Sequence, residues 1–140
     1  MLLLVEMFNT LKKKDTIMQD VFTKNYLDVI KNNAKKRIHE ITEEVFGKNY
    51  GTEIEFKEDG FEVTLFGKAY GTIYEGGITY KNGKQTDIWA SCSYDNSDDD
   101  FINRMHEDSA NKYLIEQLIE VGKKFTQAGF QNFKLKVETD

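Results

Sequence analysis

The chain has 140 residues, a net charge of −5 and a single cysteine, Cys92. This length is sufficient for one domain to bury a hydrophobic core unaided, and one cysteine cannot form an internal disulfide. We therefore expect a single domain over residues 1–140, cytoplasmic by default. Only two of the 19 basic residues are arginine, which argues against direct nucleic-acid binding through bidentate guanidinium contacts.

The negative charge is concentrated in the middle of the chain. Residues 52–110 contain five basic and thirteen acidic residues, whereas the segments before and after them carry net charges of +2 and +1. An acidic segment of this kind is either solvated surface that maintains solubility or a contact face for a basic partner. Both interpretations stay open on the sequence alone.

The chain starts with a short apolar segment. Residues 1–8 are too few to span a bilayer, and the lysines follow the apolar run, whereas a signal peptide carries its basic residues first. Leu4, Phe8 and Leu11 favour a short amphipathic helix within residues 1–14 that packs against the domain. An exposed segment that dimerises or contacts a membrane surface is the alternative, but we expect no membrane partner.

A long helix is predicted after this segment. Thr16 and Gln19 have the spacing of a capping box, apolar residues then recur at three- and four-residue steps, and Gly47 is the expected left-handed cap. Asparagine competes with the helical backbone for hydrogen bonds, so a kink or break at Asn32-Asn33 is an alternative to a continuous helix.

A second helix is predicted after the acidic run at residues 93–100. This run lacks the glycine and glutamate positions of an EF-hand calcium loop, so we interpret Ser97 or Asp98 as a helix cap followed by acids that favour the helix dipole. A further cap sequence at residues 106–109 predicts a bend or a new helix, and Gly129 ends the pattern. The apolar side of this helix is expected to include Phe101, Ile102 and Met105.

Between the two helices, residues 52–96 alternate apolar and polar side chains and are divided by glycines. Ile54 and Phe56 alternate with charged residues, and Asn82-Gly83 is a typical type I′ turn sequence. These patterns predict an antiparallel meander of four or five strands. A final strand, in which Phe133, Leu135 and Val137 alternate with polar residues, is expected to pair with the sheet.

The predicted fold class is α+β. We expect a single two-layer domain in which a meander of 4–5 strands is flanked by a long N-terminal helix and a C-terminal helix, plus the final C-terminal strand. The helices cover one sheet face, and the other face meets water.

The predicted wet face is our candidate site. Tyr70 and Tyr74 share one parity while Ile73 lies on the other, and Trp89 shares its parity with Asp87. Tyrosine and tryptophan concentrate binding energy in interfaces. The predicted partner-binding residues are Tyr70, Tyr74, Trp89, Glu53, Glu55, Glu62 and Asp87. In the alternative interpretation, the aromatic rings cover the core from a second side beneath the N-terminal segment.

Catalytic and cofactor motifs are not recognisable in this sequence. Cys92 lies on the apolar parity of its strand, and neither His39 nor His106 has a partner at metal-ligand spacing. Residues 77–86 resemble a phosphate loop only superficially, because Gln85 stands where serine or threonine is required. We therefore expect no enzymatic activity, no cofactor and no metal.

The sequence favours a non-enzymatic protein-binding module that docks an acidic, aromatic sheet face on a basic protein surface. By analogy alone, an inhibitor of a nucleic-acid enzyme, of the phage or mobile-element type, would have these features. One alternative is an oligomeric structural or accessory protein, such as a homodimer joined through residues 1–11 or a sheet edge. Another is a small-molecule-binding domain with a cavity between the helices and the sheet.

Overall fold

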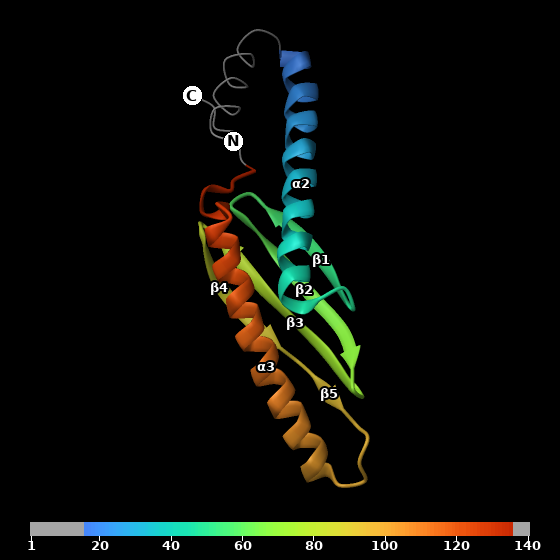
Figure 1. The fold of residues 1–140 in the computed structure, drawn as a ribbon. Coiled ribbons are helices and arrows are strands. Elements are labelled where there is room, and N and C mark those ends of the chain that lie inside the picture. Colours follow the sequence, from blue (N-terminus) through green and yellow to red (C-terminus); the bar gives the residue numbers. More distant parts are fainter. Residues whose placement is uncertain (1–15, 136–140) are drawn as a thin grey trace.

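A computed structural model describes the backbone of residues 16–135 and the side chains of residues 23–135. The predicted short helix within residues 1–14 lies outside the described residues. The fold is α+β, as predicted, with two long helices on one face of an antiparallel sheet (Figure 1). The elements in chain order are α2 (Thr16–Phe46), β1 (Tyr50–Lys57), β2 (Gly60–Ala69), β3 (Thr72–Lys81), β4 (Lys84–Ala90), β5 (Ser93–Tyr94), α3 (Asp100–Gln127) and the 3-10 helix η1 (Phe130–Asn132).

The sheet is a meander with the strand order β1-β2-β3-β4, and every pair of neighbours is antiparallel. The short strand β5 pairs with the start of β3, with Thr72 opposite Tyr94. Asn82 and Gly83 both have positive φ angles, 53° and 84°, in the two-residue turn between β3 and β4. The predicted type I′ turn is therefore confirmed.

Helix α2 is continuous from Thr16 to Phe46, so the alternative of a break at Asn32-Asn33 is not observed. Gly47 has a φ angle of +80°, and its N–H donates to the carbonyl of Glu43 at 2.8 Å, which confirms the predicted cap. The predicted capping box involves side chains outside the described ones. The buried apolar residues recur at helical spacing: Ile30, Ala34, Ile38, Ile41 and Phe46.

Helix α3 runs without interruption from Asp100 to Gln127, so the bend predicted at residues 106–109 is wrong. The predicted cap is also wrong, because Asp99 is the N-cap and accepts a hydrogen bond from the Phe101 N–H at 2.9 Å. Packing explains the continuity: the buried face of α3 continues past the local cap signal through Ala110 and Leu114. Gly129, with a φ angle of +93°, ends the helical segment as predicted.

The N-terminal turns of α3 place apolar side chains outward. Phe101, Ile102 and Met105 are 67%, 41% and 54% exposed, so their predicted burial is wrong. The buried position belongs to Asn103, which accepts a hydrogen bond from the Ser97 N–H at 3.1 Å and donates one to the Ser97 carbonyl at 2.9 Å. This polar contact with the preceding loop sets which side of the helix faces inward.

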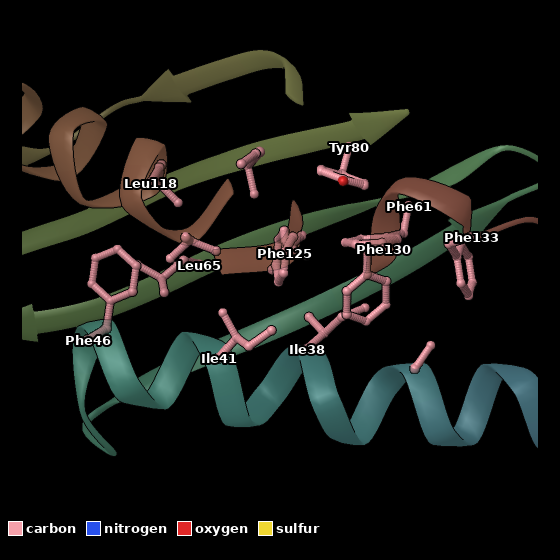
Figure 2. Close-up of a cluster of buried hydrophobic side chains, with 14 of the residues drawn as sticks. Ile38, Ile41, Phe46, Phe61, Leu65, Tyr80, Leu118, Phe125, Phe130 and Phe133 are labelled. Atoms are coloured by element: carbon pink, nitrogen blue, oxygen red, sulfur yellow. The ribbon is translucent and has the colours of Figure 1, made fainter. Parts of the chain in front are cut away.

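The core lies between the helices and the sheet, and aromatic rings gather around Phe61 (Figure 2). Phe61 stacks on Tyr80 at a ring-centroid distance of 5.4 Å and meets Phe125, Phe130 and Phe133 edge-on at 5.2, 5.3 and 5.7 Å. Tyr80 is almost fully buried, and its hydroxyl donates to the Gly83 carbonyl at 3.0 Å. This hydrogen bond offsets the free-energy cost of removing the Tyr80 hydroxyl from water.

The predicted C-terminal strand is absent from residues 133–135, which follow η1 without joining the sheet. Phe133 and Leu135 are both buried. The Leu135 N–H donates a hydrogen bond to the carbonyl of Glu58, in the turn between β1 and β2, at 2.8 Å. The reason is that η1 directs Phe133 onto Phe61 inside the core. Val137 lies outside the described residues.

Candidate protein-binding face of the sheet

The strand register divides the side chains of the sheet between two faces. Phe61, Val63 and Leu65 of β2 are buried under the helices, and their direct neighbours on the other strands share that face. Residues of the opposite parity form the other side, which no described helix covers and which we call the open face. Its members are Gly51, Glu53, Glu55, Lys57, Gly60, Glu62, Thr64, Phe66, Lys68, Ile73, Glu75, Gly77, Thr79, Lys81, Lys84, Asp87 and Trp89.

Acidic residues form a row across the middle of the open face. Glu55 is directly opposite Glu62, Glu62 is opposite Thr79, and Thr79 is opposite Asp87. We call Glu55, Glu62 and Asp87 the acidic row. Like charges directly opposite one another on a sheet are destabilising, and Glu55 and Glu62 form such a pair. Glu53 is opposite Thr64, one step along the strands from this row.

Lysines border the acidic row near the turns that join β1 to β2 and β3 to β4. Lys57 is opposite Gly60, Gly60 is opposite Lys81, and Lys81 is opposite Lys84. The Lys57 ammonium lies 2.9 Å from the Glu55 carboxylate, and the hydrogen bond with Glu55 raises the pKa of Lys57. A depression of about 350 Å³ at this end is lined by residues that include Lys57, Glu62, Thr79 and Lys81.

Two aromatic rings lie against glycines on the open face. Trp89 is directly opposite Gly77, and Phe66 is directly opposite Gly51. In each pair the ring occupies the space that a Cβ atom on the glycine would need. Trp89 remains 40% exposed and Phe66 46% exposed. The absence of a side chain at both glycines therefore allows large rings to lie on the sheet while one side stays accessible.

Tyr74 is not on the open face, so its predicted placement there is wrong. Its ring lies on the helix side, 6.0 Å from the ring of Tyr50 and 6.3 Å from that of Tyr113 on α3. Gly76 and Gly77 hide the alternation at this point because neither has a side chain. Counting back in steps of two from the buried Ile78 would have assigned Tyr74 to the covered face.

Ile73 and Phe66 belong to the open face and were missed. Ile73 is 51% exposed and lies opposite Lys68, although its apolar character predicted the covered parity. Both residues neighbour charged residues of the same face, since Phe66 is opposite Glu75. An alternation of apolar residues with polar ones indicates the inner face only when the outer face is wholly polar, and here it is not.

Tyr70 lies neither in a strand nor on the flat part of the sheet. It forms the two-residue turn between β2 and β3 together with Gly71, with φ angles of 52° and 80°. Its side chain is 101% exposed. A left-handed conformation costs an ordinary L-residue roughly 1–2 kcal/mol. The Asn96 side chain donates to the Gly71 carbonyl at 3.0 Å and thereby joins this turn to the loop after β5.

Other chemically notable side chains have structural partners. Cys92 is buried, and burial raises the pKa of its thiol, so the reactive thiolate is disfavoured. His39 Nδ1 lies 2.7 Å from the Thr52 hydroxyl and joins α2 to β1. Within residues 23–135, no group of three or more His, Cys, Asp or Glu side chains is arranged to hold a metal ion.

A second depression, of about 190 Å³, lies where α2 meets the turn that follows α3. It is lined by Asn33, Ala34, Arg37, Ala128, Gly129, Phe130 and Phe133. In the part of the chain that the structure describes, neither long helix contains an apolar stretch sufficient to cross a bilayer.

Comparison of the chain with models of known protein families, with curated proteins and with solved structures found no match.

The open face combines two kinds of exposed side chain. The apolar side chains of Trp89, Phe66 and Ile73 share it with the acidic row, and the antiparallel strands position both. Interfaces between proteins in general exclude water from apolar groups and pair opposite charges.

Proposed function

We propose that this protein is a non-enzymatic binding module whose open face docks on a basic surface of another protein. The observation that carries the proposal is the juxtaposition of the exposed ring of Trp89 with the acidic row, since Trp89 lies two residues from Asp87 on β4, while the exposed ring of Phe66 lies farther along the same face. Of the predicted site residues, Glu53, Glu55, Glu62, Asp87 and Trp89 share this face. They are the residues expected to contact the partner.

The two kinds of side chain have different roles in the proposed complex. Aromatic rings that are accessible on one side can be buried with little loss of side-chain entropy, so they supply most of the affinity. The acidic row attracts a basic surface over a distance and sets the orientation of docking, because long-range attraction acts mainly on association rate and specificity. Binding should therefore weaken as salt increases.

A basic partner surface is also what nucleic-acid enzymes present to phosphates. Carboxylates on neighbouring strands are spaced by about 4.8 Å per strand, and they could occupy such a surface in place of phosphates. We therefore include in the proposal, by analogy alone, an inhibitor of a nucleic-acid enzyme of the phage or mobile-element type.

The test is a pull-down from cell lysate in which the tagged full chain is the bait, performed at low and at high salt. The wild type should capture a basic protein at low salt and release it at high salt. Two changes, the single substitution W89A and the triple substitution E55Q/E62Q/D87N, should each reduce capture by about tenfold or more, equal to about 1.4 kcal/mol.

The matched control removes three charges from the helix side of the molecule. Glu43, Glu116 and Glu120 are exposed on α2 and α3, and the triple substitution E43Q/E116Q/E120Q should leave capture unchanged. Equal loss in both triple variants, or capture that resists high salt, would contradict docking through the open face.

Self-association is a second candidate function, favoured by the exposed side chains of Phe101 and Met105 on α3. Apolar residues gathered on one helix turn are typical of an interface between protein chains. Light scattering across a concentration series tests this candidate. A monomer at the highest concentration reached would remove the homodimer from consideration.

A further inference from the structure

Tyr70 is unfavourable for folding in two respects. Its backbone has a φ angle of 52°, which lies in the left-handed region, and its side chain is 101% exposed. A bulky residue in this conformation is an outlier, and a fully exposed ring contributes no burial to the folded state. Stability of the isolated chain therefore does not account for tyrosine at this position.

A second two-residue turn in the same sheet has the same backbone angles and serves as a reference for this one. Asn82 and Gly83 adopt φ angles of 53° and 84°, almost the same as those of Tyr70 and Gly71, at 52° and 80°. Asparagine is the residue that such two-residue hairpin turns favour at the first position. Two turns of the same geometry thus differ in whether their first residue suits the turn.

We infer that Tyr70 is the anchor of the partner contact and that its ring enters an apolar pocket beside the basic surface of the partner protein. This inference rests on the proposed function and deepens it. The turn is preorganised for binding. Ala69 and Thr72 are paired at its base, and the Asn96 side chain donates a hydrogen bond to the Gly71 carbonyl. Binding therefore costs little further conformational entropy in the turn.

The position of the turn specifies the partner further. Ile73 lies just beyond the turn on the open face, whereas the acidic row crosses β3 at Thr79. Six residues of strand separate Ile73 from Thr79, which corresponds to about 20 Å, and Tyr70 lies further out, in the turn before Thr72. The partner surface should accordingly present its apolar pocket more than about 20 Å from its basic centre.

The experiment replaces Tyr70 with the residue of the reference turn. In Tyr70→Asn, we expect the melting temperature to rise by roughly 2–8 °C, because the left-handed turn is relieved. We also expect capture of the salt-sensitive partner in the same pull-down to fall by about tenfold or more. Tyr70→Ala removes the ring but keeps an unsuitable residue in the turn, so it should lose capture without the rise in melting temperature.

The converse substitution is the control. Asn82→Tyr should lower the melting temperature, since it places tyrosine in the same left-handed conformation at the first position of the other turn. A melting temperature of Tyr70→Asn that is unchanged or lower would overturn the claim that tyrosine destabilises this turn. Unchanged capture by Tyr70→Asn would overturn the anchor alone, whereas failure of the wild type to capture a salt-sensitive partner would overturn both the anchor and the proposed function.

Discussion

Trp89 and Gly77 are direct neighbours on β4 and β3, and the indole Nε1 lies 2.5 Å from the position that a Cβ atom at residue 77 would take. The carbonyl of Val63 lies 3.0 Å from the same position. A side chain at residue 77 and the present position of the indole therefore exclude each other. The glycine determines how the ring is presented on the open face.

Gly77→Ala should displace the indole of Trp89. We expect a red-shifted tryptophan emission that acrylamide quenches more strongly, and a loss of stability of about 1–3 kcal/mol from overpacking. Gly51→Ala is the matched control, because a Cβ atom there would meet the ring of Phe66. Trp89 is the only tryptophan in the chain, so an emission shift in Gly51→Ala would contradict this account.

Asn103→Ala should destabilise the loop that leads into α3. The substitution leaves the N–H and the carbonyl of Ser97 without the partner that the Asn103 side chain supplies at 3.1 and 2.9 Å. Unsatisfied polar groups of this kind cost about 1–3 kcal/mol. Urea unfolding should show this loss, and hydrogen exchange should become faster at Ser97. Arg104→Ala, at an exposed neighbouring position, should change the stability by less than about 0.5 kcal/mol.

Phe125→Ala should cost about 3–5 kcal/mol of unfolding free energy. Phe125 is fully buried, and its ring lies 5.2 Å from that of Phe61 and 5.8 Å from that of Tyr80. Phe101→Ala makes the same chemical change on the same helix at a residue that is 67% exposed, and it should change stability by less than about 0.5 kcal/mol. Comparable losses in the two variants would show that the core is assigned wrongly.

The Cys92 thiol should react slowly with iodoacetamide in the native protein and rapidly in urea. Burial raises the pKa of Cys92 above its usual value, so the folded state holds a proton that the unfolded chain loses at lower pH. The contribution to stability is present below the unfolded pKa and is lost as the pH rises through the folded pKa. Cys92→Ala should remove this alkaline component from the unfolding free energy, and mass spectrometry follows the alkylation.

The candidate site was predictable where the alternation of side chains was uninterrupted. Glu53 and Glu55 alternate with Ile54 and Phe56, and Trp89 follows the same pattern relative to Ile88, so their placement on one face was evident from the sequence. Tyr74 could not be placed in the same way, because the glycines that follow it carry no side chain to mark the parity. Its side was decided by packing against Tyr113, a residue on a distant helix.

The sequence by itself determined the features that depend on one residue's backbone preference or on a short local pattern. These are the helix ends at Gly47 and Gly129, the turn at Asn82-Gly83 and the hairpin of β1 and β2. Tertiary structure decided the N-cap and orientation of α3 and the path of the chain after Gly129. The physical reason is that the alternative caps, and the alternative apolar faces, differ little in local free energy. A few kcal/mol of packing around Asn103 and Phe61 therefore selects among them.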